Sequence, residues 1–186
     1  MSVSLFVRLN RPLTIAAIET AVMTALREVL NLDFQQRVHA EFDETDAGGE
    51  SSVSLDVKSK SVLVAMDGHE ERVQIMPLVV PGWRADDAEI EDETLLSVTW
   101  HFMRTPLCWA LCAAVAIGVA REQQADIQDN STWFTDVNDQ GPDQFCCALR
   151  PDTACSDILL AADCLYVKMP KSRAVMELMK GLGLQG

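Results

Sequence analysis

Two residues near the middle of the chain are the best suited to chemistry: a cysteine at the start of an apolar stretch and a histidine shortly before it. A helix that begins at Pro106, with Thr105 as its cap, would carry Cys108 in its first turn. Free N–H groups and the helix dipole lower the pKa of a thiol at that position. If the preceding turn brings the His101 imidazole to this sulfur, the pair could act as a thiol nucleophile. The alternative interpretation is structural, with Cys108 as a small core residue and His101 as a half-exposed strand residue.

The cysteines could also bind a metal. Cys108 and Cys112 lie four residues apart, which places both on one face of a helix. Two more ligands would have to come from a histidine or from the other cysteines, which are Cys146, Cys147, Cys155 and Cys164. Because the chain has no CxxC or HxxxH pair, we expect no metal site and no cofactor. In an extended segment the adjacent pair would have one buried thiol and one near the surface.

A group of aspartates surrounds Trp133 and Phe134. Its members are Asp126, Asp129, Asp136, Asp139 and Asp143. Carboxylates at such spacing could hold Ca²⁺, but the EF-hand pattern, with its central Gly and final Glu, is absent. We expect these aspartates to be solvated turn residues.

Two acidic stretches point to binding rather than catalysis. Glu41 to Glu50 holds five acidic residues and Asp86 to Glu93 holds six, and neither contains a basic residue. Such runs are often solvated loops, but they can also form a docking surface for a cationic protein, with a nearby tryptophan as a desolvated anchor. The candidate partner-binding residues are Trp83, Asp86, Asp87, Glu89, Glu91, Asp92, Glu93, Asp43, Glu44 and Asp46.

The net charge limits the classes of partner. Fifteen Lys and Arg against 28 Asp and Glu give a formal charge of −13. A field of that sign repels phosphate backbones and anionic membrane surfaces, so we expect neither nucleic acid nor a membrane as a partner. A basic protein is the complementary partner. The first residues show no secretion-signal pattern and the cysteines are irregularly spaced, so we expect a cytoplasmic protein with reduced thiols.

The stretch from Pro106 to Gln124 organises the predicted fold. It has no charged residue between Leu107 and Ala120 and is rich in alanine. A helix that is apolar on every side must be buried on every side, and this one is too short for a hydrocarbon core of about 30 Å. The sequence therefore predicts a fully buried helix at about 106–124.

The segments before this helix follow simple periodic patterns. Alternation predicts strands and a 3.6-residue period predicts a helix. We expect strands at 3–9, 52–58 and 94–103, a helix from a Thr14 cap to Leu30, a loop at 41–50, and a hairpin of 61–66 with 71–76 around Asp67–Gly68. Pro77 places the end of the second hairpin strand at a sheet edge or just beyond it.

The segments after the buried helix are shorter. We predict short strands at 125–128, 131–137 and 145–149, an extended segment at 164–169, and a last helix from Pro170 to Lys180 that stops at Gly181. The pattern at 153–162 fits a helix or a strand. The whole chain, 1–186, is predicted to be a single α+β domain with a mixed or antiparallel sheet and helices packed on one face.

This order of elements resembles a group of uncharacterised bacterial α+β domains. The resemblance lies in a strand before an amphipathic helix, a hairpin, a strand before a small-residue helix, and then Trp133, Phe134 and Asp136 after a polar turn. It covers about residues 1 to 140. Because the group includes immunity proteins for secreted toxins, the resemblance implies an inhibitor without catalysis.

The leading hypothesis is a cytoplasmic, non-catalytic binding protein, an immunity or antitoxin-type inhibitor of a basic protein toxin. One alternative is a thiol-dependent enzyme that uses Cys108. Another is a self-associating structural module, whose homo-oligomer would have a mass in solution well above 20.5 kDa.

Overall fold

The computed structural model describes residues 4–45, 54–80, 92–100, 105–130 and 132–170. The helices within these ranges are α1 (Ile15–Leu30), α2 (Pro106–Gln123), α3 (Pro142–Leu149) and α4 (Ile158–Lys168). The strands are β1 (Leu5–Arg8), β2 (Leu13–Thr14), β3 (Val38–Phe42), β4 (Ser54–Leu55), β5 (Val62–Met66), β6 (Arg72–Val80), β7 (Glu93–Trp100), β8 (Ile127–Gln128) and β9 (Asp139–Gln140).

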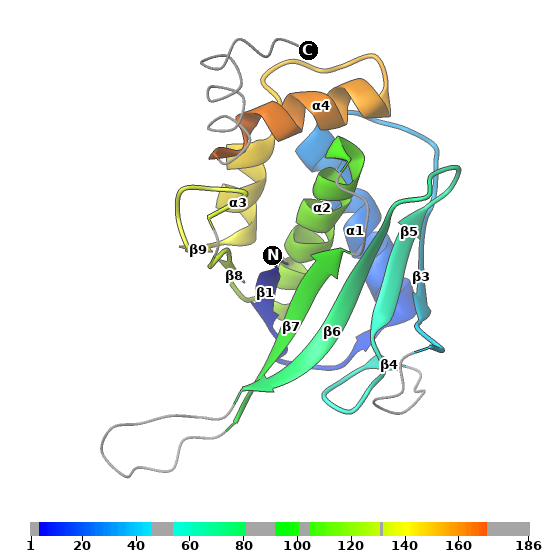
Figure 1. The fold of residues 1–186 in the computed structure, drawn as a ribbon, viewed down its shortest axis with the longest axis vertical. Helices are drawn as coiled ribbons and strands as arrows, with labels where there is room; N and C mark the ends of the chain where they lie inside the picture. The colour runs from blue at the N-terminus through cyan, green and yellow to red at the C-terminus, as the bar shows by residue number, and fades with distance from the viewer. Residues whose placement is uncertain (1–3, 46–53, 81–91, 101–104, 131, 171–186) are drawn as a thin grey trace, which may run out of the picture.

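Seven of these strands form one sheet in the order β3-β5-β6-β7-β1-β8-β9, and β2 pairs with β4 separately. Every pairing is antiparallel. Helices α1 and α2 lie together on one face of the large sheet, and α4 crosses their ends (Figure 1). The predicted α+β fold, with a sheet covered by helices on one face, is therefore confirmed, and the sheet is antiparallel.

Strand alternation explains why the described helices pack on one face of the sheet. Val62, Ile75, Val98 and Leu5 are consecutive partners across four strands, and all four are buried. Their neighbours along each strand point to the opposite face, as the two-residue period of a strand requires. The buried apolar residues of the sheet and of all four helices form one core cluster.

Helix α1 has the predicted bounds because both of its ends are capped. The Thr14 hydroxyl accepts a hydrogen bond from the Ala17 N–H, and Asn31 ends the helix in the left-handed conformation, with φ 51°. Its apolar stripe, which includes Ile18 and Val22, is buried against α2 and the sheet.

Helix α2 confirms the predicted buried helix. The Thr105 hydroxyl accepts from the Cys108 N–H at 3.1 Å, Pro106 is at the first helical position, and Gln124 ends the helix at φ 53°. Every residue from Leu107 to Ala120 is buried. Small residues permit this enclosure: a Cβ at Gly118 would lie 2.8 Å from the carbonyl carbon and oxygen of Ala21 in α1.

Several strand predictions are corrected. The alternating segment β3 begins before the predicted 41–50 loop and extends to Phe42, and β4 is two residues long. β6 does not end at Pro77; it continues to Val80. Pro77 is nevertheless at a local edge, because β5 begins opposite Ile75 and, among the described residues, β6 beyond Ile75 pairs only with β7.

Three predictions of extended structure after α2 are wrong. Residues 132–137 are irregular, 145–149 belong to α3, and 164–168 belong to α4. The short apolar runs in these helices resemble buried strands, because periodicity cannot separate the two at that length. Cys146 is buried and Cys147 exposed, as predicted, although a helix presents them. Residues 171–180 of the predicted last helix and the first two residues of the strand predicted at 52–58 lie outside the described residues.

Candidate protein-binding surface

The sheet topology directs the described parts of the two acidic stretches, 41–45 and 92–93, to the same end of the sheet. Phe42, at the end of β3, pairs with Val62 at the start of β5, and Val80, at the end of β6, pairs with Glu93 at the start of β7. Because β5 and β6 are antiparallel neighbours, both pairs of strand ends point to the lower end of the sheet in Figure 1, where β6 and β7 extend five residues beyond Ile75, the partner of Val62. We call this the acidic end, and its described carboxylates belong to Glu41, Asp43, Glu44, Asp92 and Glu93.

The described carboxylates of the acidic end have weak local partners. Glu44 Oε2 lies 3.2 Å from Lys60 Nζ, and Glu93 Oε1 lies 3.1 Å from Arg8 Nε. The Glu44 side chain is 75% exposed. Surface ion pairs of this kind contribute at most about 1 kcal/mol, so a partner's cations could replace the lysine or arginine at little cost.

The other predicted binding residues divide into two groups. Asp43 accepts hydrogen bonds from the Thr45 N–H and hydroxyl, which fixes the turn after β3, and Asp92 is exposed. The remaining candidates lie outside the described residues; they are Trp83, Asp86, Asp87, Glu89, Glu91 and Asp46.

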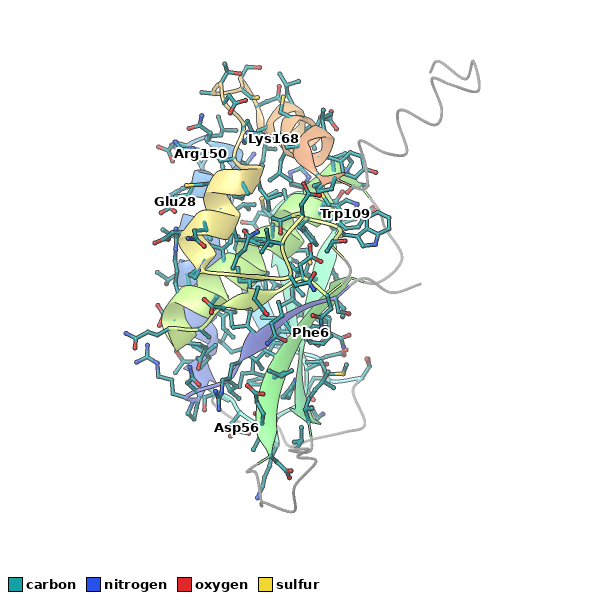
Figure 2. All side chains as sticks on the ribbon, turned by 90° about the vertical axis from the view of Figure 1, so that its left-hand side faces the viewer. Phe6, Glu28, Asp56, Trp109, Arg150 and Lys168 are labelled. Atoms are coloured by element: carbon teal, nitrogen blue, oxygen red, sulfur yellow. The ribbon has the colours of Figure 1, made fainter. Side chains whose placement is uncertain are left out.

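An apolar surface that the sequence analysis missed leads to the acidic end. The sheet face opposite α1 and α2 carries five half-buried apolar side chains, which we call the open sheet face: Phe6, Leu63, Met76, Leu78 and Leu95. Figure 1 looks onto this face, and Figure 2 shows Phe6 on the side of β1 away from α1. The strands have apolar residues on both faces, and that pattern is the signal by which the surface could have been found.

A polar groove of about 320 Å³ borders the acidic end. Its charged side chains are those of Arg8, Glu93 and Asp126, and its other polar lining residues include Asn10, Gln124 and Gln128. Two carboxylates against one guanidinium give the groove a net negative charge. It therefore matches a lysine or arginine side chain of a partner better than an anion.

Gln123 holds one wall of this groove. Its side chain is buried at the end of α2, where Oε1 accepts from the N–H groups of Asn10 at 2.6 Å and Arg11 at 2.9 Å. Nε2 donates to the Arg11 carbonyl at 3.0 Å. Gln123 thus ties the segment after β1 to α2. In the sequence, the only signal for this role is a polar residue at the end of an apolar helix.

One of the five aspartates contradicts the expectation of solvated turns. Asp129 is fully buried, and its carboxylate accepts hydrogen bonds from the N–H groups of Trp133, Phe134 and Thr135 at 3.2, 2.8 and 3.2 Å. It is buried because the irregular segment after β8 has backbone donors that no strand satisfies. The other four aspartates of the group are exposed, as expected.

The candidate thiol nucleophile is deeply enclosed. Burial raises the pKa of Cys108 to about 12, and the negative charge of Glu71 adds to the shift. This direction is opposite to the lowered pKa that its position at the start of α2 predicts. Burial also raises the pKa of Cys112. His101 lies outside the described residues, so its predicted contact with Cys108 is not described.

We expect Cys108 and Cys112 to resist alkylation in the folded protein. At a pKa of about 12, roughly one Cys108 thiol in 10⁵ is ionised at pH 7, and only the thiolate is a good nucleophile. Iodoacetamide at pH 7 should modify the exposed Cys147 first and reach the two α2 thiols only after unfolding, as mass mapping would show. Rapid native alkylation of Cys108, slowed by His101→Ala, would instead support the thiol enzyme.

The described residues include no group of three or more His, Cys, Asp or Glu side chains placed to hold a metal ion. Among the described helices, none combines the length and the apolar character needed to cross a bilayer.

Comparisons with protein-family models, with curated proteins and with solved structures find no match to this chain. The resemblance to toxin-immunity domains therefore stays a prediction.

Proposed function

We propose that the chain is a cytoplasmic, non-catalytic binding protein of the immunity or antitoxin type, which inhibits a basic protein toxin by covering part of its surface. The observation that supports this proposal is that the described parts of both acidic stretches, 41–45 and 92–93, lie toward the same end of the sheet. Stretches about 40 residues apart in the sequence then contribute to one negative field.

The net charge of −13 supports rapid encounter with a cationic partner. Complementary potentials raise association rates by steering diffusion, and the effect weakens with salt. The polar groove beside the acidic end suits a lysine or arginine side chain of the partner. The half-buried side chains of the open sheet face offer apolar contact area next to these charges, as protein interfaces combine them.

A charge-neutralised variant tests the proposal. We expect Asp86→Asn, Asp87→Asn, Glu91→Gln and Asp92→Asn together to slow association with the partner by about tenfold or more at low salt, because steering depends on local charge. The measurement is surface plasmon resonance against the purified, net-positive products of the neighbouring genes, at several salt concentrations.

The control removes the same charge from the opposite end of the molecule. Its four positions lie near the end crossed by α4 or at the β5–β6 turn: Asp33→Asn, Glu70→Gln, Asp152→Asn and Asp163→Asn. This variant should keep at least half of the association rate. Equal losses of association rate in both variants would mean that net charge alone, and not the acidic end, controls association. If none of the basic neighbours bound, the proposal would be contradicted.

The self-associating module makes a different prediction for the same protein. If the open sheet face binds a second copy, light scattering should give about twice the monomer mass of 20.5 kDa, and Phe6→Ser should restore the monomer. A monomeric mass at high concentration would leave the face available to another protein.

A further inference from the structure

Two of the six cysteines hold their sulfur atoms in contact although they belong to different elements. Cys155 lies in the segment between α3 and α4, and Cys164 lies on α4. The Cys155 thiol donates to the Cys164 sulfur, and the two Sγ atoms are 3.6 Å apart. Both residues are partly exposed, whereas Cys108, Cys112 and Cys146 are buried.

We propose that Cys155 and Cys164 form a redox modification site, which closes to an intramolecular disulfide by exchange with a small-molecule disulfide of the glutathione type. The site is at the α4 end of the molecule, away from the acidic end. It is therefore independent of the proposed inhibitor function.

The surroundings of the pair permit closure. A disulfide bond is about 2.05 Å long, so the sulfur atoms must approach by about 1.6 Å from their present 3.6 Å. Apart from Cys155 itself, residues 152–157 are all exposed, so this segment can move without disturbing the core. Its two ends are fixed: Pro151 is buried, and the Asp157 carboxylate caps α4 by accepting from the Leu160 N–H at 2.9 Å.

A lysine already holds the same segment against α4. Lys168 Nζ donates to the Arg150 carbonyl at 2.6 Å and lies 3.0 Å from Asp152 Oδ1. Figure 2 labels Arg150 and Lys168 at this end of the molecule. These contacts keep the backbone around Cys155 close to the helix that carries Cys164, so both sulfurs are available for the same reaction.

The exchange proceeds in two balanced steps. The Cys164 thiolate, which can accept the Cys155 hydrogen bond, attacks one sulfur of the small disulfide, and one small thiolate leaves as the mixed disulfide forms. The Cys155 thiolate then attacks the Cys164 sulfur of the mixed disulfide and releases the second small thiolate. The protein loses two protons and two electrons, and one small disulfide is reduced to two thiols.

The test equilibrates the full-length protein with mixtures of oxidised and reduced glutathione, followed by acid quenching and alkylation. We expect the folded protein to lose the mass of two hydrogen atoms and two alkylation sites. Cleavage before aspartate separates the two cysteines, because Asp157 and Asp163 lie between them, so the product should be a Cys155 peptide joined to a Cys164 peptide. The equilibrium constant should exceed that of the urea-unfolded chain by about tenfold or more, because the fold holds the thiols together.

Three variants complete the experiment. Cys147→Ser removes another exposed thiol and should leave the reaction unchanged. Cys155→Ser and Cys164→Ser should each stop at a mixed disulfide with glutathione. Mixed disulfides alone in the parent protein, a bond between two chains, or an equilibrium constant no larger than in urea would each overturn the proposal.

Discussion

Gly118→Ala should destabilise the protein by about 2 kcal/mol, although alanine is the better helix former by about 1 kcal/mol. The new Cβ would lie 2.8 Å from two backbone atoms of Ala21 and 2.9 Å from the Val22 nitrogen. Backbone atoms within a packed helix cannot rotate away, so α1 and α2 must separate and lose contacts. Gly118→Val should cost more than about 3 kcal/mol. Urea unfolding followed by circular dichroism measures both changes.

Gly141 provides the comparison for this prediction. A Cβ there meets only Asp126 Oδ1 at 3.8 Å, so Gly141→Ala should change the free energy of unfolding by less than about 1 kcal/mol. If Gly118→Ala instead stabilised the protein, helix propensity would outweigh the close contact, and α1 and α2 would not approach as closely as described.

Asp129→Ala should reduce the free energy of unfolding by about 4 kcal/mol. The substitution removes a buried charged acceptor from the N–H groups of Trp133, Phe134 and Thr135 and leaves those donors without it. Trp133 stacks on Trp109 with ring centroids 5.2 Å apart, so the loss should also change the tryptophan fluorescence of the folded state. Urea unfolding followed by fluorescence measures both effects.

Two further substitutions give smaller expected losses of stability, with which the loss in Asp129→Ala can be compared. Asp129→Asn keeps one carbonyl oxygen as an acceptor and should cost about half as much. The exposed Asp126→Asn should change the free energy of unfolding by less than about 0.5 kcal/mol. Similar small losses at both positions would mean that water, rather than Asp129, satisfies the backbone donors.

Local signals in the sequence are sufficient for the longer elements. Thr14 and Thr105 mark helix starts, and Asp67–Gly68 marks the β5–β6 hairpin, where Gly68 has the positive φ of 77° that the turn requires. Helices α3 and α4 also have start signals, Pro142 and the Asp157 cap. The apolar run in α3 is short, and α4 has apolar residues on all of its sides. Hydrophobic periodicity therefore did not distinguish these helices from strands.

The candidate site depends on facts that no local pattern contains. Asp43 and Glu93 come to one end of the sheet only because β5 and β6 lie between β3 and β7, and strand order is a tertiary property. The burial of Asp129 depends on the three backbone donors that surround it, and its neighbour Asp126, with the same side chain, is exposed. Composition predicts a cationic partner, whereas the fold determines where the negative charges meet.

Strand β1 sits between β7 and β8, and both partners come from much later in the chain. During synthesis β1 is made before both partners, because β7 begins at Glu93 and β8 at Ile127. Contacts of such long sequence separation close late and slow the search for the native state. Leu5 and Val7, which end fully buried, therefore remain without these partner strands until residues 93–128 have been translated, and in that interval a chaperone or an aggregating neighbour can bind them.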